Sequence, residues 1–168
     1  MSCAQNSNID SLFRRFDDDP LNTQKLKIFL SSQIEKKIDS LSVAPIQVVD
    51  SAKTYIGTKY CYGGKTRNCT DCSGLLFQVF SSLNITLPHN SDDLAHWGRI
   101  IINKDSLKTG DFVFFVDTYK TNKFITHSGI YVSDGNFVHA STQRGVILSN
   151  LKEKYYAQKF VFGTRIFE

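Results

Sequence analysis

Two cysteines, Cys69 and Cys72, stand three positions apart in the stretch NCTDCSGLLFQVF, directly before an apolar run with helical spacing. Sulfur atoms in this arrangement can serve three kinds of chemistry. They can form half of a structural zinc site, a redox-active pair, or a single nucleophile at the start of a helix. Each kind needs different partners, so the rest of the sequence discriminates among them.

A zinc site built on Cys69 and Cys72 would need two more ligands, and the candidates are His127 and His139. Zinc sites that combine a CxxC pair with two histidines usually space those histidines three to five residues apart. Here they are twelve apart, so no spacing supports zinc. A thioredoxin-like redox pair would follow a strand in a βαβ unit, and no such strand is predicted before Cys69. We therefore expect no metal and no cofactor.

The remaining interpretation makes Cys72 a nucleophile. Its thiolate is the reactive form, and both the positive end of a helix and a neighbouring imidazolium lower a thiol pKa. Cys72 precedes an apolar stripe with helical spacing, formed by Leu75, Leu76, Val79, Phe80 and Leu83. Unpaired N–H groups at the helix start would stabilise an oxyanion, and Gly74 would leave room for a substrate backbone. The alternative is a buried cysteine in a core helix.

Two histidines decide between these alternatives, since His127 opens HSGIYV and His139 lies in FVHAS, on either side of an SDG turn. A two-residue loop at Asp134-Gly135 would point the two rings to opposite faces. A three-residue loop with Gly135 left-handed would place His139 opposite Gly129 and both rings on one face. The nucleophile interpretation therefore predicts the three-residue loop. One nitrogen of the imidazole base would take the thiol proton, and the other would donate to an acceptor that fixes the tautomer: a carboxylate, an amide or a second histidine.

The elements that would position these residues fall into two halves. Apolar spacing predicts one amphipathic helix over 22–41 and a second over 46–56 that ends at Gly57. A short helix N-capped by Ser91 and ended by Gly98 follows the helix of Cys72. After Gly110, the runs rich in Val, Ile, Phe and Tyr predict antiparallel strands: DFVFFV, SGIYVS, NFVHAS, GVILSN and KFVFGTRIF. Helices first and strands second indicate the α+β class.

Length and charge give broader limits. A chain of 168 residues fits one domain, which we place at 46–168, after an N-terminal extension at 1–45 whose first ten residues we expect to be disordered. The net charge of +4 forms no basic block, so we expect no nucleic acid partner, whereas an acidic polymer such as a cell wall is compatible with it. The longest uncharged apolar run is too short to span a bilayer.

The chain begins MSCAQNSN, with a cysteine at position 3 followed by small polar residues. This resembles the start of a mature bacterial lipoprotein in which Met1 replaces a removed leader. It predicts a membrane tether through a lipidated Cys3; the alternative is an incidental cysteine. The amphipathic helix of the extension would cover the domain, dock a partner, or space the domain from a membrane anchor.

Five motifs together resemble a known family. YCYGG…TDCSGLLFQVF, LPHNS, GDFVFF, THSGIYV and NFVHAS follow one another, over about Val48 to Glu168, in the order and spacing of the NlpC/P60 cysteine peptidases. The resemblance implies a papain-like fold, with helices packed on an antiparallel sheet. It also implies hydrolysis of amide bonds in bacterial peptidoglycan stem peptides, next to γ-linked D-glutamate or diaminopimelate. We accordingly expect an exported protein of the bacterial cell envelope, and we expect it to be a monomer.

In the matching positions Cys72 would be the nucleophile, His127 the general base and then the acid, and His139 the orienting residue. The resemblance also implies that Tyr60 and Ser91 lie at the substrate cleft. Asp71 and Ser73 match positions that bind the amino end of the substrate in some members. The alternatives are a core tyrosine at Tyr60 and simple helix caps at Asp71 and Ser91.

Three features depart from the family pattern or lie outside it. His89 replaces an arginine that is more usual in LPRxS, and we interpret it as a surface residue, whereas His96 is expected to be structural. Cys61 and Cys69 do not belong to the pattern, and the sequence leaves open whether they form a disulfide. Two other functions are compatible with the same residues: a different amide hydrolase or acyltransferase, or a wall-binding module without turnover.

Overall fold

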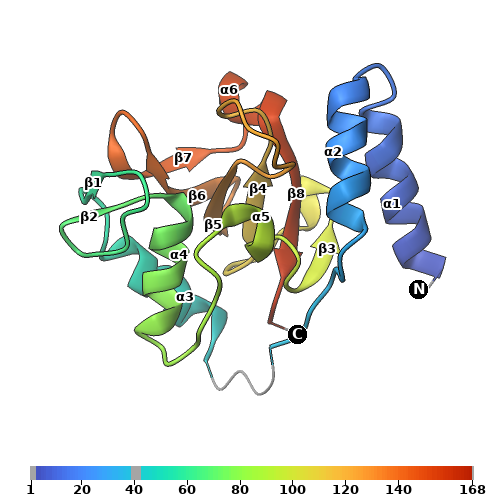
Figure 1. Ribbon diagram of the computed structural model, residues 1–168. Coiled ribbons are helices and arrows are strands. Elements are labelled where there is room, and N and C mark those ends of the chain that lie inside the picture. Colours follow the sequence, from blue (N-terminus) through green and yellow to red (C-terminus); the bar gives the residue numbers. More distant parts are fainter. Residues whose placement is uncertain (1–2, 39–42, 168) are drawn as a thin grey trace.

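The computed structural model describes residues 3–38 and 43–167, with side chains from residue 9 onward (Figure 1). Its centre is a six-stranded antiparallel sheet in the order β3-β8-β4-β5-β6-β7. The strands are β3 (Arg99–Ile101), β4 (Phe112–Phe115), β5 (His127–Ser133), β6 (Asn136–Ser141), β7 (Gly145–Asn150) and β8 (Phe160–Arg165). The five predicted strands are confirmed, and β3 is an edge strand that the sequence pattern did not reveal.

Helices pack on this sheet, which confirms the α+β class. Helix α3 (Pro45–Lys53) lies against α4 (Cys72–Ser81), and α4 packs on β5 and β6 (Figure 1). Its apolar stripe explains this, because Leu75, Leu76, Val79 and Phe80 are all fully buried. The short α5 (Ser91–Leu94) also contacts β5, and α6 (Lys154–Lys159) leads into β8.

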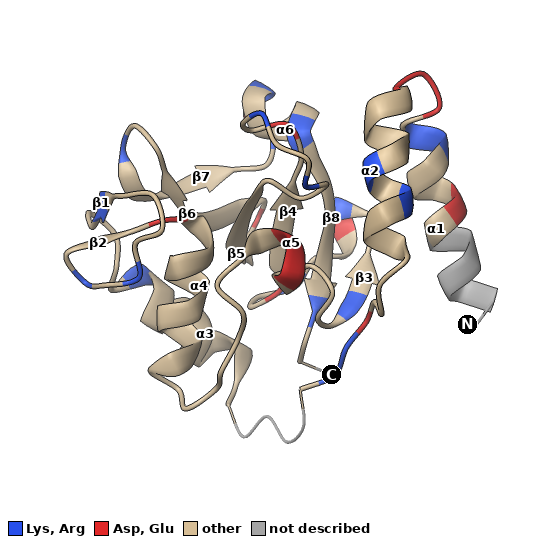
Figure 2. Ribbon diagram, viewed as in Figure 1, with Lys and Arg blue, Asp and Glu red and all other residues tan. Residues whose placement is uncertain are grey.

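Smaller elements complete the chain. The two-residue strands β1 (Lys59–Tyr60) and β2 (Cys69–Thr70) pair in parallel just before α4, and a 3-10 turn spans Lys104–Ser106. Figure 2 shows Lys and Arg residues on the connection between β1 and β2, and acidic residues on α5. Within the described ranges, every helix is too short or too polar to cross a membrane.

The N-terminal extension differs from expectation. Residues we expected to be disordered belong to α1 (Cys3–Arg15), and α2 spans Pro20–Leu30 instead of 22–41. Residues 31–38 leave the helix because their backbone is used elsewhere: the Lys36 N–H donates to the His96 carbonyl at 2.7 Å, and the Gly98 N–H donates to the Lys36 carbonyl at 2.8 Å. Tertiary hydrogen bonds thus override the helical spacing of Ile34 and Ile38. Leu41 lies outside the described residues.

Helices α1 and α2 cover one end of the sheet (Figure 1). Three of their apolar side chains, Leu12, Leu26 and Phe29, are buried in the same core as the sheet, and so is Phe16 in the turn between the two helices. The ring of Phe16 lies 5.5 Å from that of Phe124, which precedes β5. Of the three roles considered for the extension, covering the domain is therefore the one that these contacts support.

The hairpin between β5 and β6 corrects the predicted loop. Ser133 pairs with Asn136, and both Asp134 (φ 53°) and Gly135 (φ 83°) are left-handed, so the loop has two residues instead of three. The register then shifts by one residue at Val132, a bulge within β5. This bulge restores the register that the three-residue loop would have given, which brings His139 beside Gly129.

Candidate active site

The sulfur of Cys72 lies at the first residue of α4, as the sequence predicted. Asp71 is the N-cap: its Oδ1 accepts a hydrogen bond of 2.7 Å from the Gly74 N–H. The side chain of Cys72 is partly exposed, although its neighbours Asp71 and Ser73 are buried. Cys72 thus lies at the partly exposed start of a helix whose residues are mostly buried.

The two predicted histidines contact each other. His127 Nε2 lies 2.9 Å from His139 Nδ1, with the ring planes 88° apart, so both rings occupy one face of the sheet. His127 is partly exposed, whereas His139 is 1% exposed. On its other side, His139 Nε2 lies 3.1 Å from both Ser149 Oγ and Tyr156 Oη. His139 is thus a buried residue with fixed partners on both nitrogens.

A glycine makes room for this pair. A side chain at Gly129 would come within 2.9 Å of the Phe137 ring and 3.1 Å of the His139 Cβ. These distances show that the ring of Phe137 and the base of His139 occupy the space beside Gly129. Gly129 therefore permits the close approach of β5 and β6 at the site.

The sulfur is hydrogen-bonded to the first of two linked hydroxyl groups. Cys72 Sγ lies 3.3 Å from Ser91 Oγ, which in turn lies 2.9 Å from Ser128 Oγ. Ser128 is the residue after His127, so this chain of hydroxyl groups brings the start of β5, which carries His127, close to the sulfur. Among the described residues no hydrogen bond joins the sulfur to an imidazole.

The environment of the sulfur opposes charge, contrary to expectation. Burial raises the pKa of the Cys72 thiol; Asp71 raises it further, and hydrogen bonds from Ser91 and from backbone N–H groups lower it only in part. Burial also lowers the pKa of His127 to about 4, although the negative charge of Asp71 opposes this. The free site accordingly pairs a neutral thiol with a neutral imidazole, and the imidazole is the form that accepts a proton.

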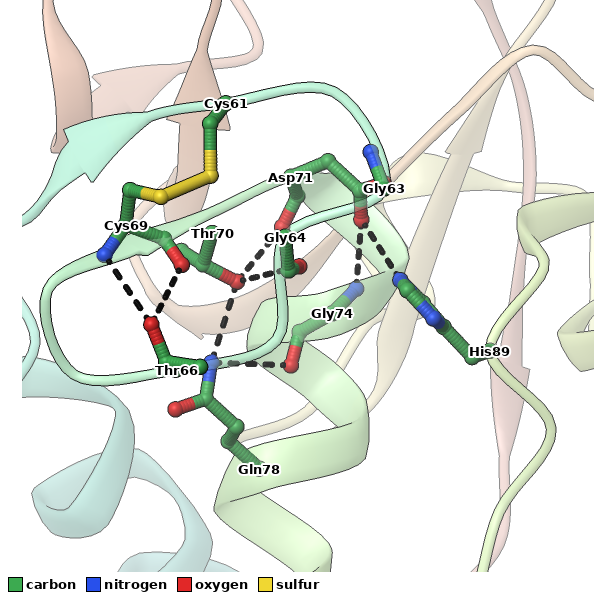
Figure 3. Close-up of a disulfide and its surroundings, with 10 residues drawn as sticks. All are labelled: Cys61, Gly63, Gly64, Thr66, Cys69, Thr70, Asp71, Gly74, Gln78 and His89. Carbon is green, nitrogen blue, oxygen red and sulfur yellow. Dashed lines mark hydrogen bonds and ion pairs between the residues drawn. A yellow bond between two sulfur atoms is a disulfide. The ribbon is translucent and has the colours of Figure 1, made fainter.

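Asp71 joins the site to a loop closed by a disulfide (Figure 3). Cys61 and Cys69 are bonded, with their Cα atoms 5.5 Å apart, and Asp71 Oδ2 accepts from the Gly63 N–H within this loop at 2.8 Å. Since Cys69 is bonded to Cys61, neither a redox pair with Cys72 nor a zinc site that uses Cys69 is compatible with the structure.

Gly74 packs against the same loop. A side chain at position 74 would overlap the carbonyl oxygen of Gly64, and the Thr70 hydroxyl donates to that oxygen at 3.3 Å (Figure 3). The space that we assigned to a substrate backbone is therefore filled by the protein's own loop, and that expectation is wrong. Gly74 instead allows the loop to dock at the start of α4.

Of the residues expected to bind substrate, Tyr60 lies near both Cys72 and Asp71: burial raises its pKa to about 12, and the charges of those two residues add to the effect. Asp71 is occupied by groups of its own chain, since its Oδ1 also accepts from Ser73 Oγ at 3.1 Å. Ser91 is not the cap of α5. Asn90 is that cap, and this leaves the Ser91 hydroxyl directed at the sulfur.

The two remaining histidines differ. His96 is structural, as expected: it is buried, with Nδ1 2.9 Å from the Asp92 carbonyl and Nε2 3.1 Å from the Phe29 carbonyl. His89, expected at the surface, is only partly exposed and contacts Asp71. Its side chain is 22% exposed, and its Nε2 lies 3.1 Å from Asp71 Oδ1 (Figure 3). A carboxylate only accepts, so this nitrogen carries a proton.

Sequence reasoning missed several contributors to the site: Ser128, Ser149, Tyr156 and Tyr119. The first two are polar residues within apolar strand runs, and this pattern was the available signal. Tyr119 is 54% exposed; partial burial raises its pKa, and the charges of Cys72 and Asp71 add to this effect. The loop that carries it therefore reaches the neighbourhood of the sulfur.

Comparison with known proteins agrees with this arrangement. The model of the NlpC/P60 family matches residues 57–165. The chain is 42% identical over 113 residues to a probable endopeptidase NlpC homolog of Haemophilus influenzae, covering 67% of this chain and 57% of that protein. It is 39% identical to the gamma-DL-glutamyl hydrolase of Bacillus subtilis, covering 76% and 30%, respectively. It is 31% identical to a murein DD-endopeptidase/LD-carboxypeptidase of Escherichia coli, covering 71% and 62%.

The fold is also similar to solved structures. An NlpC/P60 family protein from Bacillus cereus superposes with a TM-score of 0.68 at 25% identity, over 76% of this chain and 42% of that one. This similarity agrees with the expected papain-like arrangement of helices on an antiparallel sheet. The chain spans less than two thirds of the length of each of the curated relatives described above.

Proposed function

The chain belongs to the NlpC/P60 family, and on this premise we propose that it is a cysteine endopeptidase that hydrolyses amide bonds in peptidoglycan stem peptides. The observation that supports this most is the His127–His139 contact of 2.9 Å, together with the hydroxyl chain that runs from Ser128, the residue after His127, through Ser91 to the Cys72 sulfur. Cys72 is the nucleophile, His127 the general base and acid, and His139 the residue that orients His127.

The chemistry begins with a proton transfer from sulfur to imidazole. His127 Nε2 faces His139, so Nδ1 is the nitrogen left to accept the thiol proton. The thiolate attacks the amide carbonyl, and backbone N–H groups at the start of α4 stabilise the oxyanion. His127 then protonates the leaving amine, and water hydrolyses the thioester to complete the turnover. These steps require no metal or cofactor.

The relatives support the substrate class. The Bacillus subtilis relative is named as a gamma-DL-glutamyl hydrolase and the Escherichia coli relative as a murein endopeptidase. We extend this to the present chain as hydrolysis next to γ-D-glutamate or diaminopimelate, with Tyr60 and Ser91 at the cleft. The protein then acts as a monomer in the bacterial cell envelope, with Cys3 as the site of lipid attachment.

Incubation with defined stem peptides, followed by mass spectrometry of the products, tests this proposal. The wild type should release a fragment ending at the γ-linked residue, and Cys72→Ala should release none. Cys3→Ser is the matched control, because it also removes a cysteine but should cleave at the wild-type rate. Unchanged cleavage by Cys72→Ala would contradict the assignment, and binding without cleavage by the wild type would indicate a wall-binding module.

A further inference from the structure

Two serine hydroxyls form a chain that ends at the Cys72 sulfur. Ser128 Oγ lies 2.9 Å from Ser91 Oγ, and Ser91 Oγ lies 3.3 Å from Cys72 Sγ. Both serines are buried: Ser91 is 7% exposed and Ser128 is 0% exposed. Neither hydroxyl therefore has bulk water as a ready partner.

The backbone around Ser91 is fixed on both sides. The Asn90 side chain accepts from the N–H groups of Asp92 and Asp93, and this caps α5 immediately before Ser91. Asp92 Oδ1 accepts from the Ile125 N–H at 2.8 Å and ties α5 to the segment that leads into β5. Ser91 and Ser128 are thus brought together by elements that are themselves anchored to each other.

Counting hydrogens gives the direction of this chain. Each hydroxyl has one hydrogen to donate and can accept twice. If Ser91 donated to Ser128, the buried hydrogen of Ser128 would have no acceptor among the described residues, and the sulfur would receive nothing from Ser91. If Ser128 donates to Ser91, then Ser91 donates to the sulfur and both hydrogens are used. The second direction avoids leaving a buried donor unpaired.

We propose that Ser128 and Ser91 form a directed hydrogen-bond relay that stabilises the thiolate of Cys72. Ser91 touches the reacting sulfur and is a catalytic residue, whereas Ser128 is a positioning residue that acts through Ser91. The inference rests on the proposed function only in taking Cys72 as the nucleophile.

The relay offsets two effects that oppose ionisation of the Cys72 thiol. Burial and the negative charge of Asp71 both oppose ionisation of Cys72, and the Ser91 hydrogen bond is the largest contribution in the opposite direction. A hydrogen bond to a charged acceptor is stronger than one to a neutral acceptor, so the relay strengthens as the sulfur becomes a thiolate.

Alkylation of Cys72 by iodoacetamide tests the relay without a substrate. In a Cys3→Ser background under non-reducing conditions, the rate at Cys72 is followed by peptide mass spectrometry between pH 5 and 10. Ser91→Ala should react about tenfold more slowly at pH 7, with its pH midpoint moved upward by roughly one unit. Ser91→Thr keeps a hydroxyl and should recover most of the rate, and Ser128→Ala should show a smaller decrease.

The double variant separates a relay from two independent structural effects. Because Ser128 acts through Ser91, Ser91→Ala combined with Ser128→Ala should react no more slowly than Ser91→Ala alone. Ser82→Ala changes an exposed residue at the end of α4, the helix that begins at Cys72. It is the control, and its Cys72 should be alkylated at the wild-type rate. Circular dichroism verifies that every variant is folded.

An unchanged midpoint in Ser91→Ala would overturn the relay. The relay would also be overturned if the alkylation rate of the double variant fell by the product of the two single-variant fold decreases. If the protein alkylates as expected but cleaves no stem peptide, the proposed substrate is wrong and the relay stands.

Discussion

His127 Nε2 lies 2.9 Å from His139 Nδ1, and under the proposed mechanism this contact determines which nitrogens of the two rings carry hydrogens. For His127 Nδ1 to accept the thiol proton, the hydrogen of His127 has to sit on Nε2 and be donated to His139. The hydrogen of His139 then sits on its Nε2, where Ser149 and Tyr156 each offer an oxygen at 3.1 Å.

These two oxygens give the first prediction. Tyr156→Phe or Ser149→Ala alone leaves one acceptor for His139 Nε2–H, so each single change should lower kcat less than threefold. The double variant leaves that hydrogen unpaired and favours the unproductive tautomer, so kcat should fall by about tenfold with KM nearly constant. Steady-state kinetics on a stem peptide measures both constants, and equal losses in the singles and the double would argue against the tautomer scheme.

Acid sensitivity gives the second prediction. Burial lowers the pKa of His127 from 6.5 to about 4 and also lowers the pKa of His139. Below pH 6.5 the unfolded chain therefore binds more protons than the folded one, so stability is lost as the pH falls from 6.5 through 4. For His127 alone the loss is at most about 3 kcal/mol.

Urea unfolding at several pH values between 7 and 4 checks this. His139→Gln removes one of the two titrating rings, so its free energy of unfolding should decline less steeply with acid than that of the wild type. Parallel slopes for the two proteins would show that His139 is not the source of the acid sensitivity.

Gly74 gives the third prediction. In an ordinary helix Gly→Ala stabilises by roughly 0.5–1 kcal/mol, but here the new methyl group would overlap the Gly64 carbonyl. Gly74→Ala should therefore destabilise by about 3 kcal/mol and displace the loop that donates to Asp71. Chemical denaturation gives the sign of the change in the free energy of unfolding. A Gly74→Ala variant more stable than the wild type would mean that the loop is not docked on α4.

The disulfide gives the fourth prediction. Cys61 and Cys69 are separated by 8 positions, and replacing both by serine should lower the free energy of unfolding by about 2 kcal/mol. The same loop supplies the Gly63 N–H to Asp71, so kcat/KM should also fall. Denaturation and kinetics without reductant measure these effects. If the double serine variant kept the wild-type kcat/KM, the loop closed by the disulfide would have no effect on catalysis.

The sequence predicted those parts of the fold that depend on local patterning. The stripe from Leu75 to Leu83 predicted the helix of Cys72, and the apolar runs after Gly110 predicted five strands, because burial of one helix face or strand run is visible in residue spacing. Helix α2 ended earlier than its spacing indicated, because the backbone of Lys36 pairs with that of Trp97 and its neighbours. Such pairing joins segments that are distant in the sequence, so the local spacing of apolar residues does not reveal it.

The residues of the candidate site were likewise predicted only in part. Cys72, His127 and His139 were predicted from residue type and motif, and the structure brings all three to one end of the sheet. The hairpin was predicted with the wrong loop, since a bulge at Val132 reached the same register by another route. The roles of His89, Ser128 and Gly74 depend on contacts between segments distant in sequence, which no local pattern encodes.

The most direct test of the central claim is intact-mass detection of an acyl group on the Cys72 sulfur in reactions quenched with acid during turnover of a stem peptide. The thioester mechanism predicts an adduct whose mass equals the acyl part of the peptide, located on Cys72 and absent from Cys72→Ser. Cleavage that proceeds at the wild-type rate in Cys72→Ser or His127→Ala, with no adduct in the wild type, would contradict it.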